Sequence, residues 1–143
     1  MITYPFAFLT SVAIAISFRA PRSAILWSGL CGLAAWAGYD LSRQLGLPDP
    51  AAIFLGALVL GLLAEVLARR LHHPAILFAI PGLFPLVPGI IAYRGVLLLS
   101  QNRLAEGAWM LARALLFAGL LAAGLAIPPV LFRRWGGRHR HPR

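Results

Sequence analysis

The sequence PGLFPLVPG, at residues 81–89, interrupts an apolar run that extends over about residues 74–99. Its prolines are Pro81, Pro85 and Pro88, and its glycines are Gly82 and Gly89. A proline inside a helix removes a backbone hydrogen bond and clashes with the preceding turn, which costs about 3 kcal/mol. Proline also disfavours helical backbone at the residue before it, and glycine leaves the backbone permissive. The sequence therefore predicts a helix that is broken near its middle.

The composition indicates an integral membrane protein. The chain has 143 residues and a mass of 15.4 kDa, of which 60% are hydrophobic and 12% charged, with a mean hydropathy of +0.81. An ordinary soluble domain has about 25% charged residues, and a domain of this size cannot hide so much apolar surface. A soluble globular protein and a disordered chain are therefore excluded. Five spans of about 20 residues would use the whole length.

The apolar segments predict an all-α, polytopic membrane bundle with about five transmembrane helices. Ser23 is the expected N-cap of the second helix, and Asp49-Pro50 is the expected start of the third. The fifth is expected to end at Pro128-Pro129. The five segments cover about residues 4–18, 23–41, 50–68, 74–99 and 105–132, and the fourth is the broken one.

The basic residues give an expected topology. All 13 are arginine, the net charge is +9, and most lie singly or in pairs between apolar runs. With the N-terminus outside, the loops and the tail that lie inside carry more arginines than those outside, as the positive-inside rule requires. This placement also argues against nucleic-acid binding. We expect one transmembrane bundle over residues 1–132 and a basic, disordered cytoplasmic tail over residues 133–143 that is attracted to anionic lipid.

Small residues recur at the spacing of helix contacts. In lipid, helices associate by close backbone approach at such sites. The pattern favours one bundle over five independent anchors. The pairs that are four residues apart are Ser28 with Gly32, Ala34 with Gly38, Ala57 with Gly61, and Gly119 with Ala123.

The break in the fourth segment is the candidate binding site. Irregular backbone at membrane depth is tolerated only where protein covers it or where it lines a wet cavity, and broken helices build the binding sites of many transporters. The second half-helix begins at Pro88-Gly89. Residues 89–92 would therefore offer free N–H groups and a positive dipole end to an anion. The alternative is a tight turn between two short spans that binds no ligand.

Charged residues near the break are further candidates. Arg94, beside Tyr93, either clamps a carboxylate bidentately or extends to the outer interface. Glu65 lies four residues before Arg69. It is either half of a surface pair or a proton carrier, because acids buried in membranes are costly and usually functional. Arg113 is expected to face protein rather than lipid.

The sequence gives no sign of an enzyme. Cys31 is the single cysteine and cannot form an internal disulfide, so we expect a small packing residue there. His72 and His73 are adjacent in the chain, and neighbouring side chains point apart, which makes a poor metal site. The sequence holds no nucleophile triad, glycine-rich phosphate loop or Cys/His cluster. We therefore expect no catalytic residue, no metal and no cofactor.

The run PGLFPLVPG, followed by Tyr93-Arg94, resembles a signature of the threonine/serine exporter (ThrE) family. That signature is Pro-Gly-x-x-Pro-Leu-Val-Pro-Gly-x-x-x-Tyr-Arg. Specifically, the chain looks like the small YjjB-type membrane subunit of that family. The sequence GLLAE at residues 61–65, RR at 69–70 and PA at 74–75 is also similar to the family pattern. The resemblance extends from about residue 6 to residue 132.

The resemblance implies an inner-membrane subunit of a bacterial secondary exporter driven by protons. Its substrates would be threonine and serine, or small dicarboxylates such as succinate, and its partner a YjjP-type membrane subunit; a homo-oligomer is also open. The alternative is a noncatalytic membrane scaffold that stabilises the partner. The resemblance also implies roles for single residues, with Glu65 as a possible proton carrier. The residues that it places in the substrate path are Pro81, Gly82, Pro85, Pro88, Gly89, Tyr93 and Arg94.

Overall fold

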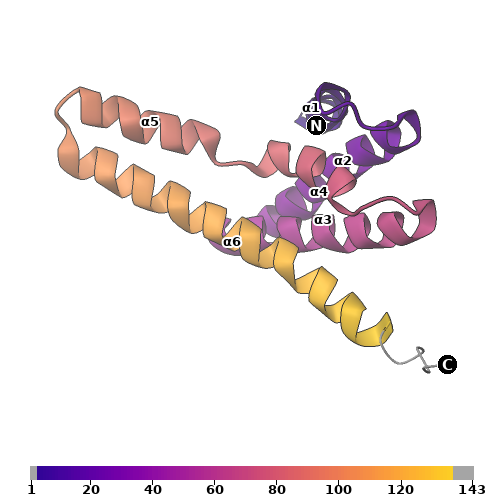
Figure 1. Ribbon diagram of the computed structural model, residues 1–143. Helices are drawn as coiled ribbons and strands as arrows, with labels where there is room; N and C mark the ends of the chain where they lie inside the picture. The colour runs from indigo at the N-terminus through magenta and orange to yellow at the C-terminus, as the bar shows by residue number, and fades with distance from the viewer. Residues whose placement is uncertain (1–2, 137–143) are drawn as a thin grey trace.

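The structure, a computed structural model, describes residues 3–136 as a succession of helices (Figure 1). Each predicted apolar segment corresponds to one helix, or in the case of the broken fourth segment to three consecutive helical elements. The predicted all-α bundle is therefore confirmed. In chain order the elements are α1 (Thr3–Ser17), α2 (Arg22–Gln44), α3 (Asp49–Leu71), α4 (Ile76–Leu83), the 3-10 helix η1 (Phe84–Leu86), α5 (Gly89–Ser100) and α6 (Leu104–Gly136).

The fourth segment is broken where the prolines predict a break. α4 accommodates Pro81 in its interior, and the chain then tightens into η1 around Pro85. Val87 is extended, with φ −63° and ψ 128°, and α5 begins after Pro88. The two halves of the segment differ in direction by 52°. The discontinuous helix predicted from the sequence is confirmed.

Two predicted helix starts are wrong in detail. α2 follows Pro21, and Ser23 makes no capping hydrogen bond; the Ser23 hydroxyl lies 3.2 Å from His73 Nε2 instead. α3 follows Pro48, and Asp49 is its first residue rather than its cap. The Asp49 carboxylate is engaged by arginines of other helices, so it is not available to the N–H groups of α3.

The predicted end of the fifth segment is also wrong. α6 passes through Pro128 and Pro129 and continues to Gly136. Pro128 is buried against Gly61 of α3, so packing with a neighbouring helix offsets the lost backbone hydrogen bond. The helix thus enters the segment predicted as a tail by four residues, 133–136. The rest of that segment, with His139 and His141, lies outside the described residues.

Apolar helices of membrane-crossing length are present. Among the described residues, α3 and residues Leu104–Phe132 of α6 are each long and apolar enough to cross a membrane. The bent pair of α4–η1 and α5 is long and apolar enough only when its two halves are taken together. α1 has 15 residues and is short for a span. α2 has 23 residues but falls outside these criteria; serines, glycines and Asp40 dilute its apolar content. α1 and α2 are the remaining two of the five predicted segments.

α2, α3 and α4 enclose the core of the bundle. Phe78 of α4 and Leu60 of α3 are fully buried there. The Ser28 hydroxyl of α2 lies 3.0 Å from the Leu77 carbonyl oxygen of α4, to which it donates a hydrogen bond. Gly82 lies so close to its neighbours that an added Cβ would be 2.5 Å from Leu60 Cδ1. The first half of the broken segment is thus held tightly by α2 and α3.

α3 and α6 run in the same direction and meet through small residues. A Cβ added to Gly124 would lie 2.7 Å from Ala57 Cβ, and one added to Gly61 would lie 2.9 Å from Pro128 Cγ. The predicted pair Ala57 and Gly61 therefore forms a helix contact. The predicted pair at Gly119 does not, because nothing lies within 4 Å of a Cβ added there.

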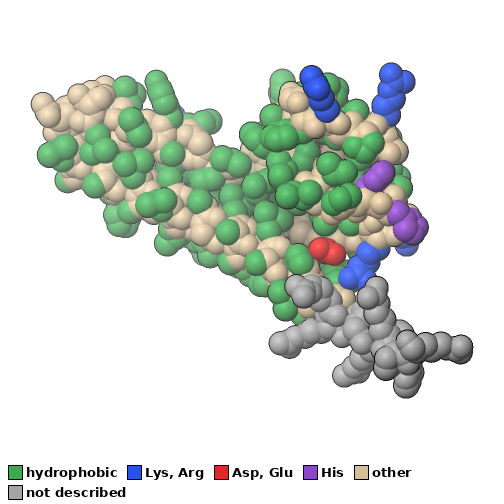
Figure 2. All heavy atoms as spheres, viewed as in Figure 1, with side chains coloured by type: hydrophobic (Ala, Val, Ile, Leu, Met, Phe, Trp, Pro, Cys, Tyr) green, Lys and Arg blue, Asp and Glu red, His purple; other side chains and the backbone are tan. Residues whose placement is uncertain are grey.

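Away from the core, α5 and the first part of α6 form a hairpin. We call α5 together with residues 104–116 of α6 the α5–α6 hairpin; it projects beyond the other helices (Figure 1). α5 packs almost entirely against α6. The contact is close at Gly95, where an added Cβ would lie 2.9 Å from Leu111 Cγ. The visible surface of the hairpin is largely apolar (Figure 2).

We expect Gly124→Val to lower the free energy of unfolding by about 1–3 kcal/mol, because the new side chain overpacks the α3–α6 contact. Gly119→Val, on the same helix, is the matched control, since its side chain meets open space and replaces a poor helix former. Thermal unfolding of the purified full chain in detergent measures both. Equal changes in the two variants would contradict the packing described here.

Candidate functional site

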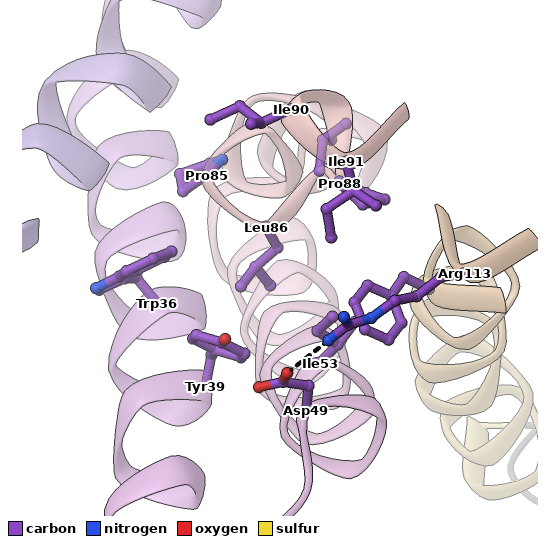
Figure 3. A pocket seen from close by; sticks show the side chains of 12 residues that line it. Trp36, Tyr39, Asp49, Ile53, Pro85, Leu86, Pro88, Ile90, Ile91 and Arg113 are labelled. Atoms are coloured by element: carbon purple, nitrogen blue, oxygen red, sulfur yellow. Dashed lines mark hydrogen bonds and ion pairs between the residues drawn. The ribbon is translucent and has the colours of Figure 1, made fainter. Parts of the chain in front are cut away.

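The break opens onto a cavity of about 360 Å³ (Figure 3). This volume falls within the range of about 300–1,000 Å³ that is typical of small-molecule sites. Its lining comes from α2, α3, η1, α5, α6 and the link between η1 and α5. The lining residues are Trp36, Tyr39, Asp49, Ile53, Pro85, Leu86, Val87, Pro88, Ile90, Ile91, Arg113 and Phe117.

A carboxylate and two guanidinium groups meet at this cavity. Arg113 Nη2 donates to Asp49 Oδ2 at 3.0 Å (Figure 3), and Arg43 Nε lies 2.9 Å from Asp49 Oδ1. The single carboxylate therefore joins the end of α2, the start of α3 and α6. The Asp49 side chain is 29% exposed and that of Arg113 is 48% exposed, so a solute can reach both. The cluster carries one negative and two positive charges, which favours an anion.

Aromatic rings support this cluster. Trp36 and Tyr39 lie on α2 with ring centroids 5.3 Å apart and planes inclined by 45°. On the other side, the Arg113 guanidinium carbon lies 5.3 Å from the centroid of the Phe117 ring. A cation–π contact of this kind attracts the guanidinium to the ring face. Arg113 is therefore oriented by both a ring and a carboxylate.

The first turn of α5 carries backbone N–H groups that have no helical acceptor. The Gly89 N–H donates to the Val87 carbonyl at 2.8 Å, and the Ala92 N–H donates to the Pro88 carbonyl at 3.1 Å. Within residues 3–136, the N–H groups of Ile90 and Ile91 have no backbone acceptor, and no side chain caps α5. Their side chains line the cavity. The start of α5, which is the positive end of its dipole, and the Asp49–Arg113 pair thus border the same cavity.

The structure separates the predicted substrate-path residues into those that line the cavity, those buried in the bundle and those exposed on α5. Pro85 and Pro88 line the cavity. Pro81 and Gly82 are buried in the bundle, where Gly82 contacts α2 and α3. Gly89 is exposed, with nothing within 4 Å of an added Cβ. The other two, Tyr93 and Arg94, are exposed one turn further along α5 and are not among the lining residues.

Glu65 lies away from this cavity. It is in the last third of α3, whereas Asp49 is the first residue of that helix. Glu65 Oε2 lies 3.9 Å from Arg69 Nε, and the Glu65 side chain is 17% exposed. The Arg69 guanidinium also lies 4.8 Å from the centroid of the Phe132 ring on α6. The structure therefore does not bring Glu65 together with the break.

Sequence reasoning missed the charged pair at the cavity. Asp49 was predicted as a helix cap, and Arg113 was expected to face protein without a named partner. The available signal was that both charges flank long apolar runs, where an unpaired charge is costly.

A further polar cluster joins α1 to α2: the Tyr4 hydroxyl donates to Asp40 Oδ2 at 2.6 Å. Among the described residues, no group of three or more His, Cys, Asp or Glu side chains is placed to hold a metal.

The helices, the membrane-length apolar spans and the break beside a charged cavity define a polytopic helical membrane protein. The chain belongs to the threonine/serine exporter family. The family model described as "Threonine/Serine exporter, ThrE" matches residues 4–131. The resemblance to this family is thereby confirmed, and the chain is a membrane component of an exporter family rather than a member of an enzyme family.

Individual relatives agree with the family assignment. The chain is 34% identical over 127 residues to a "Threonine/serine exporter" of Corynebacterium glutamicum, covering 88% of this chain and 26% of the relative. It is 29% identical over 102 residues to a "Probable threonine/serine exporter" of Mycobacterium tuberculosis, covering 71% and 19%. An uncharacterized protein of Haemophilus influenzae is 25% identical over 138 residues, covering 90% and 46%. The chain thus spans less than half the length of each of these relatives. No solved structure matches.

Proposed function

We propose that this chain is a membrane subunit of a secondary exporter for small amino acids or small dicarboxylates. The observation that carries the proposal is the cavity at the helix break, which holds an arginine and a carboxylate in contact and reachable from outside. Relatives named as threonine/serine exporters support the same class of substrate. The chain lies in a bacterial inner membrane with its N-terminus outside and its C-terminus in the cytoplasm, in accordance with the distribution of its arginines.

The charged cluster suits a solute that carries both signs of charge. An amino acid carries a carboxylate and an ammonium group, which match Arg113 and Asp49. Binding would replace the Asp49–Arg113 pair by two pairs with the substrate, so no charge is left alone in a region of low dielectric. A dicarboxylate would instead engage Arg113 and Arg43, with the free N–H groups at the start of α5 as further donors.

The break supplies the path past this cluster. Pro85, Pro88 and Gly89 keep the backbone unwound beside the cavity, and Pro81 with Gly82 anchors the first half-helix in the bundle. On α5, Tyr93 and Arg94 would continue the path one turn beyond the cavity. Hinges of this kind let two half-helices move separately during alternating access.

Transport requires a partner in this proposal. The resemblance of this chain to the small membrane subunit of the family implies that the partner is a YjjP-type membrane subunit. We expect efflux of threonine, serine or succinate from preloaded cells only when both chains are expressed. Immunoblots of the membrane fraction control for expression of each chain. Efflux from cells that contain this chain alone would contradict the two-subunit arrangement.

Arg113→Gln should raise the substrate concentration at half-maximal efflux about tenfold to a hundredfold, because a hydrogen bond to a charged group contributes about 1.5–3 kcal/mol. Arg103→Gln is the matched control, since Arg103 immediately precedes the same helix and pairs with Glu106 outside the cavity. Concentration series of efflux rates measure both. If Arg94→Gln raised this concentration and Arg113→Gln did not, the carboxylate would bind beyond the cavity rather than in it.

Glu65 is proposed as the proton carrier, since it is a largely buried carboxyl on a membrane-length helix and its ion pair with Arg69 is long. Glu65→Gln should abolish the acceleration of efflux by an imposed pH gradient. Glu106→Gln, an exposed carboxylate paired with Arg103, is the control. Efflux rates with and without the gradient, in cells or vesicles containing both subunits, make the measurement. Unchanged acceleration in Glu65→Gln would remove Glu65 from the coupling path.

The second candidate function is a noncatalytic scaffold that folds or stabilises the partner. The large apolar surface and the small-residue contacts favour it. Under this alternative, Arg113→Gln and the double variant Pro88→Leu with Gly89→Leu leave efflux unchanged, while loss of the chain lowers the amount of partner in the membrane. Under the exporter proposal both variants impair efflux at an unchanged amount of partner.

A further inference from the structure

The α5–α6 hairpin presents an apolar face that no other part of the described chain covers. Ile90, Tyr93, Arg94 and Leu97 follow the spacing of one helical face, and all four are exposed. Ile90 is 71% and Tyr93 67% exposed. The opposite side of α5 contacts α6 at Gly95, and within residues 3–136 no other element packs against the exposed face.

Arg94 distinguishes this face from an ordinary lipid-facing surface. It is exposed, and within residues 3–136 it makes no ion pair or side-chain hydrogen bond. A guanidinium amid apolar side chains in a membrane helix is costly unless it meets water or a carboxylate. It lies about six residues, or about 9 Å, from the end of α5 at Ser100.

The carboxylates of this chain are already engaged. The sequence has only four acidic residues, and each contacts another side chain. Asp40 accepts hydrogen bonds from Tyr4 and Gln44. The other three form ion pairs: Asp49 with Arg43 and Arg113, Glu65 with Arg69, and Glu106 with Arg103. A second copy of this chain would have to break one of these pairs to supply a carboxylate to Arg94, whereas a different chain can supply one directly.

We propose that the exposed face of α5 in the hairpin docks a membrane helix of a second, different protein, and that a carboxylate on that helix pairs with Arg94. The inference rests on the proposed two-subunit function and names the surface through which the subunits meet. The face continues into the cavity, because Ile90 belongs to both. The docked helix therefore covers the open side of the cavity and completes its wall.

Site-specific photo-cross-linking tests this surface. A benzophenone amino acid replaces Leu97 on the hairpin face, and in the matched control it replaces Leu9 of α1; these leucines are 42% and 57% exposed. Each variant is expressed with the YjjP-type chain, irradiated in intact membranes, and blotted for both chains. We expect cross-linking to the second chain from position 97 at about ten times the yield from position 9. Arg94→Glu should reduce that yield about tenfold, and Arg94→Lys should retain it.

A second set of variants identifies the carboxylate. Replacing each membrane-segment Asp or Glu of the second chain by Arg should restore cross-linking to Arg94→Glu at one position. A product at twice the mass of this chain would make a second copy the occupant and overturn the proposal, as would cross-linking that is insensitive to Arg94→Glu. Efflux without cross-linking from position 97 refutes the docking surface alone, and cross-linking without efflux refutes the proposed transport alone.

Discussion

The backbone around Val87 and Pro88 cannot continue as a helix, and in a membrane protein such backbone is tolerated only where protein covers it or where it lines a wet cavity. The structure meets this constraint locally, through the turn in which the Val87 N–H donates to the Phe84 carbonyl at 3.2 Å. The rest of the bundle also meets this constraint, because Gly82 and the buried Phe78 fix the preceding half-helix between α2 and α3. Small residues on those helices are what allow the close approach. The packing of the bundle and the position of the cavity both follow from the enclosure of this break.

The break itself was predictable because its cause is local. Proline and glycine act on the backbone within a turn of their own position, whatever surrounds them. The same rule failed at Pro128-Pro129, where the helix continues. There the outcome depends on Gly61 of α3, which leaves space for the Pro128 ring. Helix ends that are set by a neighbouring helix cannot be read from one segment of sequence.

The charged pair was less predictable because it is assembled from distant residues. Asp49 and Arg113 are 64 positions apart, and no periodicity connects them. An aspartate next to a proline at the start of a helix is typical of a cap, so its tertiary role was hidden. Arg94 was favoured because it follows the break closely in sequence. Five residues of helix, however, displace it by about 7.5 Å along the axis from Gly89, and it is not among the residues that line the cavity.

The positive excess at the cavity argues for exchange rather than a fixed structural bridge. A bridge needs one cation for one carboxylate, yet Asp49 contacts both Arg43 and Arg113. The second arginine adds a cost, the repulsion between two like charges, without a second anion to offset it. The cost is offset when an anionic group arrives, because the local charge is then balanced and both guanidinium groups have partners. Under the proposed function, this unbalanced cluster beside the broken helix would be most favourable with a substrate carboxylate bound, and release of that carboxylate would return Arg113 to Asp49.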